Sequence, residues 1–501
     1  MITLQCGRPC RVVGHRQMAL WSFMVSGMVI LLFVSAASGE SSRPFMSQKQ
    51  IEAEEYEEKG ELKNWVSYFG ESTWKAVSAQ VIRLWSSEEE QNWPQLTFGV
   101  RTIAGILLGA LAAAVASAAG LGGGLLFVPI LKLVLQFDSK TSVAMATFMM
   151  FGATTAGMAL NLMRDHPNEF NKSLVDFDIA LLLQPNMLLG ISIGVILNIM
   201  LPIWLITAFL VVTLVYMAYN TTKSGLKRWN TETELARAKR NQKKITLRRS
   251  NTASEKALTE HLLGFYRSVS SLHSVKAILA LVFVWLTLFF LQILRGGFGR
   301  QGLLHVIQCG VSYWLLTASQ IPVSFGVSAW NIWQLRSTSA ASLEPGTSDN
   351  QEEGYTLGPK QGIFLSGMAL LGGLVAGMLG SGGAVVINPL LLSVGVLPQV
   401  TTATTLFLMF FSSSMSAAEY WLMGRVPVGY SVIAALICAA SSALGIVGLQ
   451  KVVNKYGRPS LIVFLVAFVM GFCAIFMSVY GTIDVWQQYK SGADMGFSIP
   501  C

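Results

Sequence analysis

Two stretches decide the fold of this chain: GLGGGLLFVPIL at residues 120–131 and GSGGAVVINPLL at residues 380–391. They align without a gap at a constant offset of 260 residues (380 minus 120). The same register continues downstream, where Thr141 and Ser142 fall on Thr401 and Thr402. Similarity at this spacing is typical of a duplicated multi-helix unit rather than of a short solenoid repeat. The sequence therefore predicts two related halves.

Each glycine run predicts a break in a membrane helix. A glycine costs a helix about 1 kcal/mol relative to alanine. Unwound backbone is tolerated at membrane depth only where it is buried in protein or lines a water-filled cavity. The stretch after the first run, Leu125 to Gln136, is too short to span a bilayer and predicts a half-helix. Backbone amides at the start of such a half-helix, together with its dipole, suit an anion.

These two breaks predict the substrate site. Glycines can instead serve only to let helices pack closely, but duplication with a proline at the same offset in both halves favours a binding site. Asn388 stands where the first half has Val128, so the two half-sites differ chemically. The predicted substrate-binding residues are Gly120, Gly122, Gly123, Gly124, Pro129, Gly380, Gly382, Gly383, Asn388, Pro389, Thr401, Thr404 and Ser413.

The composition predicts an all-α polytopic membrane protein. The 501 residues are 52% hydrophobic and 13% charged, with a mean hydropathy of +0.52, whereas soluble chains carry about 25% charged residues. Many apolar runs approach the roughly 20 residues that a spanning helix needs, and no alternating pattern of barrel strands is present. The runs lie near 102–118, 142–163, 180–200, 203–219, 276–294, 302–334, 361–379, 402–422, 428–450 and 459–481.

The beginning of the chain predicts entry into the secretory pathway. Arg8, Arg11 and Arg16 precede an apolar run that is followed by small residues, so residues 1–39 predict a signal peptide or an uncleaved signal anchor. An acidic extracytoplasmic segment follows at 40–97. The protein is then expected in the plasma membrane or an endomembrane.

Charge along the rest of the chain predicts its topology. Residues 220–275 are strongly basic and are expected to form a cytoplasmic loop under the positive-inside rule. The first transmembrane repeat (98–219) then makes an odd number of crossings, and connecting helices at 276–334 return the chain to the cytoplasmic side. After a loop at 335–360, the second repeat (361–482) begins inverted, and a tail follows at 483–501.

The sequence resembles the TauE/SafE sulfite exporter family, and especially its plant-like eukaryotic branch. Besides the two glycine stretches, the resemblance rests on segments such as FDSKTSVAMATFMMFGA at 137–153 and PQVTTATTLFLMFFSSSMSAAEYWLMGRVPVGY at 398–430. It covers most of residues 98–482. The resemblance implies outward movement of sulfite, an organosulfonate or a related sulfur anion by a secondary mechanism.

Two classes of function are compatible with these features. The first is a secondary anion transporter that works by alternating access around the two hairpins and is coupled to protons or to the anion gradient. The alternative is a membrane receptor or scaffold without transport activity. An enzyme is disfavoured because no nucleophile with a base, paired carboxylates or metal spacing is present, and no cofactor or nucleic-acid partner is predicted. His305, near a helix start, is a candidate proton relay.

Overall fold

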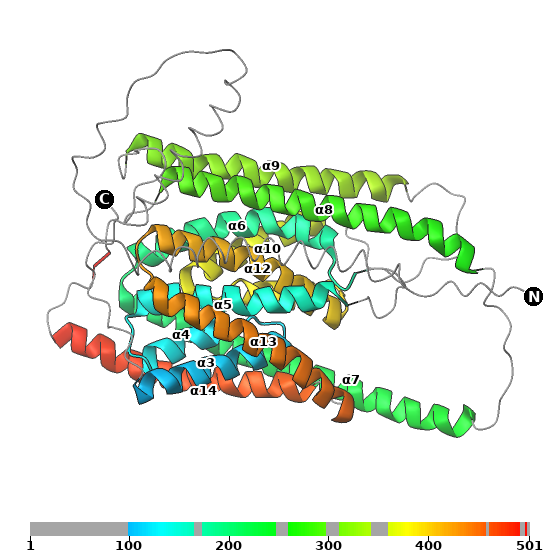
Figure 1. Ribbon diagram of the computed structural model, residues 1–501, viewed down its shortest axis with the longest axis horizontal. Helices are drawn as coiled ribbons and strands as arrows, with labels where there is room; N and C mark the ends of the chain where they lie inside the picture. The colour runs from blue at the N-terminus through cyan, green and yellow to red at the C-terminus, as the bar shows by residue number, and fades with distance from the viewer. Residues whose placement is uncertain are drawn as a thin grey trace, which may run out of the picture.

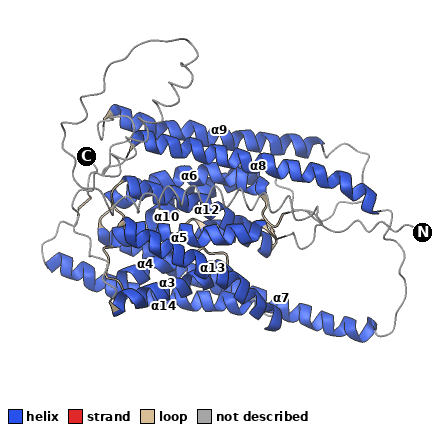
Figure 2. Ribbon diagram, viewed as in Figure 1, coloured by secondary structure: helices blue, strands red, loops and turns tan. Residues whose placement is uncertain are grey.

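The structure is a computed structural model in which all regular elements of the described residues are α-helices (Figures 1 and 2). It describes residues 99–164, 173–246, 259–296, 310–341, 359–456, 460–490 and 496–497. The predicted signal segment, the acidic segment and His305 lie outside these residues, as do residues 491–495 and 498–501 of the predicted tail. The helices are α3 (Val100–Ala118), α4 (Gly124–Leu133), α5 (Ser139–Leu162), α6 (Phe177–Met200), α7 (Ile203–Thr246), α8 (Thr259–Arg295), α9 (Val311–Ala341), α10 (Pro359–Leu379), α11 (Ala384–Ser393), α12 (Pro398–Leu422), α13 (Val428–Tyr456) and α14 (Ser460–Lys490).

The membrane prediction is confirmed by nine helices, among the described residues, that are long and apolar enough to cross a bilayer. They are α3, α5, α6, α7, α8, α10, α12, α13 and α14. The helix expected at 302–334 is found as α9, shifted to Val311–Ala341. The chain is thus a multi-pass helical membrane protein.

The central layer consists of α5, α6 and α12. The apolar windows of α5 and α6 are 89% buried and that of α12 is 94% buried, whereas those of α7 and α13 are 28% buried. Helices α5 and α12 carry buried hydroxyl side chains, such as those of Thr147, Thr154 and Ser412, and polar groups of this kind face the interior of a membrane bundle. The outer helices instead expose large apolar side chains, such as Phe283, Leu444 and Phe468, as a lipid-facing surface requires.

The packing of the helices is reciprocal. Helix α3 of the first half packs against α13 of the second, as α10 of the second half packs against α6 of the first. In the same way, the contact of α5 with α13 has its counterpart in that of α12 with α6. Two pairs, α5 with α12 and α7 with α14, join equivalent helices of the two halves. Helices α8 and α9 lie together along one edge of the bundle (Figure 1).

The basic segment at 220–275 differs from the expected loop because helices enter it from both sides. Helix α7 continues to Thr246, and α8 already begins at Thr259. The sequence pattern placed the ends at 219 and 276 because apolar residues stop there, but a helix in water needs no apolar residues to continue.

Candidate anion-binding site

The two glycine runs interrupt the helices at the predicted positions. Gly123 and Gly383 are the N-cap residues of the ten-residue helices α4 and α11, with φ of +86° and +80°. Side chains with a Cβ rarely adopt this left-handed conformation, which explains why glycine occupies both positions. The six glycines with positive φ in these two loops are Gly120, Gly122, Gly123, Gly380, Gly382 and Gly383.

Each break turns the chain back on itself. At the far end of the first hairpin, Arg101 near the start of α3 donates from Nη1 to Oε1 of Gln136, just beyond α4, over 3.0 Å. Gly105 lies so close to Leu135 that an added Cβ would be 2.8 Å from its Cγ. Helix α4 therefore runs back along α3 and returns toward the side from which α3 started.

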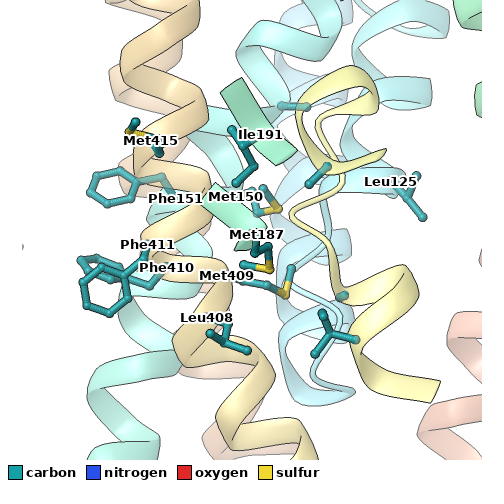
Figure 3. Packing of buried hydrophobic residues seen from close by; sticks show 14 of the residues in the cluster. Leu125, Met150, Phe151, Met187, Ile191, Leu408, Met409, Phe410, Phe411 and Met415 are labelled. Atoms are coloured by element: carbon teal, nitrogen blue, oxygen red, sulfur yellow. The ribbon is translucent and has the colours of Figure 1, made fainter. Parts of the chain in front are cut away.

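The two glycine loops touch each other in the centre of the bundle. A Cβ on Gly124 would meet the carbonyl oxygen of Gly380 and lie 3.0 Å from the Cα of Ser381. Three methionine side chains surround the second loop, and Figure 3 shows Met150, Met187 and Met409 gathered beside it. The φ of +71° favours glycine at position 382, and an added Cβ there would displace the Met150 sulfur, which would be 2.5 Å away. The contact brings residues 256 positions apart (380 minus 124) into one site.

A small inner cavity lies between the two loops. It is narrow, with room for about one water molecule, and is lined by Gly123 and Leu125 at the start of α4 and by Ser381 and Ala384 at the start of α11. The first amides of both half-helices have no partner within their own helix, which gives this cavity a positive potential. The Ser381 side chain is 1% exposed, and its hydroxyl has no hydrogen-bond partner among the described residues. A buried hydroxyl in this state is available to a ligand.

A larger outer cavity adjoins the inner one, since Leu121 and Met217 line both. Its empty volume is about 570 Å³, open solvent included. The guanidinium of Arg228 supplies a positive charge that is matched to an oxyanion. The polar residues that line it are Asn220, Thr221, Ser224, Arg228, Asn388, Thr401 and Thr402.

The α7 part of this lining was missed in the sequence. Met217, Thr221, Ser224 and Arg228 follow one face of α7 at intervals of three or four residues. Positions after 219 were predicted to form a loop, so a common helix face for these residues was not considered. The 3.6-residue spacing of these four residues was the available signal.

Asn388, predicted as a substrate residue, also joins the two halves. Its side-chain Nδ2 donates to the carbonyl oxygen of Gly120 over 3.1 Å, and its Oδ1 is buried without a partner among the described residues. Asn388 lines the outer cavity, and so do the next residue of α11, Pro389, and Thr401 of α12. The second half thus contributes three of its predicted residues to the outer cavity.

Other predicted residues support the site without lining either cavity. Pro129 is buried within α4. Thr404 accepts a hydrogen bond from the backbone N–H of Asp176, the N-cap residue of α6, over 3.0 Å. The Ser413 hydroxyl lies 3.3 Å from that of Thr154, where α12 meets α5. These contacts hold the helices that flank the glycine loops.

A buried ion pair lies at the other end of α7. Lys132 of α4 is 4% exposed, and its Nζ lies 3.1 Å from Oδ2 of Asp484 in α14. The same amine donates to Ser139 over 2.6 Å and to Thr207 of α7 over 3.4 Å. Thr207 precedes Arg228 by 21 residues (228 minus 207), or about 30 Å of helix. The two cations therefore lie near opposite ends of a stretch of α7 that is about as long as the hydrocarbon core of a membrane is thick.

Comparison with known proteins identifies the family. The family model described as "Sulfite exporter TauE/SafE" matches residues 105–296 and 365–493. Among Arabidopsis thaliana proteins, Sulfite exporter TauE/SafE family protein 2 is 38% identical over 420 residues, covering 82% of this chain and 90% of the relative. Family protein 1 is 36% identical over 415 residues, covering 82% and 91%, and family protein 5 is 38% identical over 418 residues, covering 83% and 91%. No solved structure matches the chain.

These matches extend over both halves and both glycine loops. The family is one of membrane transporters of anions, which agrees with the basic residue and the half-helix amides around the two cavities. The chain therefore belongs to the TauE/SafE sulfite exporter family and is a multi-pass membrane transporter, not an enzyme.

Proposed function

We propose that this transporter exports a small sulfur-containing anion, sulfite or an organosulfonate, by alternating access around the two glycine loops. The observation that carries the proposal is that the two cavities are neighbours, with Leu121 and Met217 in the walls of both. Arg228 lines the outer cavity, and the first residues of both half-helices line the inner one. An anion drawn in by the guanidinium would then be held by backbone amides and by the Ser381 hydroxyl. The relatives' names refer to sulfite export.

The orientation that we propose for the outer cavity rests on the charge of the segment after Arg228. Helix α7 runs from the outer cavity into the basic residues at 220–275, which the positive-inside rule assigns to the cytoplasm. The outer cavity then faces the cytoplasm, and the Lys132–Asp484 ion pair lies near the opposite face. An exporter takes up its substrate from the cytoplasm, so the outer cavity would be the place where the anion enters.

The reciprocal packing of the halves supports rocking as the motion. Under the predicted topology the second half is inverted relative to the first. If each half takes up the conformation that the other had, the site opens to the opposite side of the membrane. The glycine loops touch at the centre, where such a motion has its pivot. A change at either loop should therefore slow transport without abolishing insertion into the membrane.

Efflux from liposomes tests the proposal. The purified full chain is reconstituted into liposomes loaded with radiolabelled sulfite, 2-hydroxyethanesulfonate or, as a charge control, choline. We expect efflux of sulfite or of the sulfonate, and not of choline, above that of protein-free liposomes. Absence of any sulfur-anion efflux would contradict the proposed substrate class.

Variants in the loops test the proposed pivot. Gly123→Val and Gly383→Val force a side chain into the left-handed region, which costs about 1–3 kcal/mol, so efflux should fall at least about tenfold. Gly471→Ala is the matched control, because an added Cβ there meets nothing within 4 Å. Full efflux in both loop variants would exclude the glycine loops from the mechanism.

A further inference from the structure

A buried carboxylate lies outside the anion path. Glu419 of α12 is 1% exposed, and its Oε1 accepts a hydrogen bond from the hydroxyl of Ser192 in α6 over 2.7 Å. Gln292 of α8 donates from Nε2 to the same oxygen, and this nitrogen lies 3.4 Å from Oε1 of Gln320 in α9. Four helices thus meet at one carboxyl group. Neither described cavity is lined by any of these four side chains.

A carboxyl group within a membrane span is costly when it is ionised, and such residues commonly serve proton or ion movement. Among the described residues Glu419 is the one carboxylic side chain that is fully buried. The first half has no counterpart, because the site combines α6, α8, α9 and α12. Packing alone is served equally well by an apolar side chain, so the retained carboxyl group calls for a functional explanation.

The two oxygens of Glu419 have different surroundings. Both donors point to Oε1, whereas Oε2 is buried without a hydrogen-bond partner in the described part of the chain. The Oε1 of Gln292 is likewise a buried acceptor without a partner there. An ionised oxygen that is buried without a donor is costly, whereas a proton on Oε2 removes the charge of the group. The arrangement suits the protonated, neutral form of the group.

The charged and titratable groups that face Glu419 are Arg295 of α8, Tyr313 of α9 and Tyr420 of α12 itself. Arg295 interacts electrostatically with Glu419 but is held by other contacts. It donates from Nη1 to Thr317 over 3.2 Å and lies 5.2 Å above the ring of Tyr313, and its Nε has no partner in the described residues. When Glu419 loses its proton, the guanidinium becomes the natural partner of the carboxylate.

The carboxyl group is mechanically connected to the second glycine loop. The hydroxyl of Tyr420, the next residue, donates to the carbonyl of Gly377 over 2.7 Å, three residues before the loop begins at Gly380. Helix α6, which supplies Ser192, also supplies Met187, whose sulfur would lie 3.2 Å from a Cβ on Gly383. A shift of α12 or α6 on ionisation of Glu419 therefore reaches the anion site.

We propose that the carboxyl group of Glu419 is the proton-binding site that couples outward anion movement to inward proton movement. The inference rests on the proposed anion export. Glu419 lies three residues before the end of α12 (422 minus 419), at the end that the predicted topology places toward the extracytoplasmic side. A proton from that side binds Oε2 and, after the halves have changed conformation, leaves to the cytoplasm while Arg295 pairs with the carboxylate. One proton enters and one leaves the group in each cycle.

The test uses the full chain in liposomes that contain radiolabelled sulfite and a pH-sensitive dye. Efflux is measured with and without an imposed pH gradient, and labelled-for-unlabelled sulfite exchange is measured without a gradient. In Glu419→Gln, which keeps the shape but cannot bind and release a proton, we expect the stimulation by a pH gradient to fall about tenfold or more. Exchange should fall much less, which shows that the variant is folded. Glu419→Asp should regain part of the stimulation.

Glu234→Gln is the matched control, because it makes the same change at an exposed position of α7. It should behave as the unchanged protein does. Full stimulation in Glu419→Gln would overturn the proposal, as would efflux in the unchanged protein that responds to a sodium gradient and not to pH. Absence of sulfite efflux and exchange in the unchanged protein would instead contradict the proposed function.

Discussion

Asn388 donates a hydrogen bond from its side-chain amide to the backbone carbonyl of Gly120, 268 residues earlier in the chain, with 3.1 Å between Nδ2 and O. The bond ties the second half-helix to the first glycine loop at the wall of the outer cavity. The equivalent position in the first half is Val128, which is apolar. The two halves therefore share a fold, but the hydrogen bond that the side chain of Asn388 makes to the other half has no equivalent at Val128.

Asn388→Ala should slow efflux by about tenfold, because the loss of one buried hydrogen bond of about 1–3 kcal/mol frees the Gly120 loop. The matched control is Asn331→Ala. Asn331 of α9 makes the same kind of bond to the carbonyl of Leu181 over 3.1 Å, but it lines neither cavity. Thermal unfolding and sulfite efflux are measured for both. Equal effects of the two variants on efflux would show that the bond is merely structural.

Arg228→Gln should raise the sulfite concentration at half-maximal transport by about tenfold, since one charge-assisted contact contributes about 1.5–3 kcal/mol. The maximal rate should change less, because the guanidinium lies in the outer cavity rather than between the loops. Concentration-dependent uptake of labelled sulfite into liposomes measures both quantities. Lys227→Gln removes an equal charge from the adjacent, exposed position. If Lys227→Gln raised the half-maximal sulfite concentration as much as Arg228→Gln does, general attraction of the anion to a basic surface would explain the effect of Arg228→Gln.

Ser381→Ala should reduce sulfite efflux while leaving thermal stability unchanged or slightly higher. The hydroxyl makes no hydrogen bond within the described chain, so its removal costs none and removes a buried polar group. Ser324→Ala in α9 is a matched variant, because Ser324 is equally buried and equally without a partner there. It should leave efflux unchanged. A marked loss of stability in Ser381→Ala would mean that the hydroxyl supports the loop and not a ligand.

Asp484→Asn should destabilise the protein more than Lys132→Met does. The first change leaves a buried cation without its counter-charge, and the partial exposure of Asp484 together with the contacts to Ser139 and Thr207 limits the loss to about 1–3 kcal/mol. The second change replaces the cation with an apolar side chain of similar length. Melting temperatures of the purified variants in detergent measure the difference, and the reverse order would contradict a stabilising role for this ion pair.

The sequence by itself determined the helices, the two breaks and the family. Apolar runs of spanning length and glycines at a fixed offset are local properties of the chain, and each has one physical outcome: a membrane helix or an interruption of one. The breaks at Gly123 and Gly383 could therefore be predicted from the order of the residues alone. The residues that line the cavities were predicted where they belong to the repeated motif, as with Asn388, Pro389 and Thr401.

Only the tertiary structure decided which side chains meet. Arg228 lines the outer cavity because α7 continues past the end of its apolar residues. The basic residues after position 219 predicted a cytoplasmic loop, so the helix face to which Arg228 belongs was not recognised in the sequence. Glu419 was missed for a different reason. Its partners Ser192, Gln292 and Gln320 come from three other helices, and no local pattern reports which faces of distant helices pack together. Only the packed bundle shows that these three side chains surround Glu419. Because a buried carboxyl group is costly in a membrane span, its burial among four helices marks it as a candidate functional group.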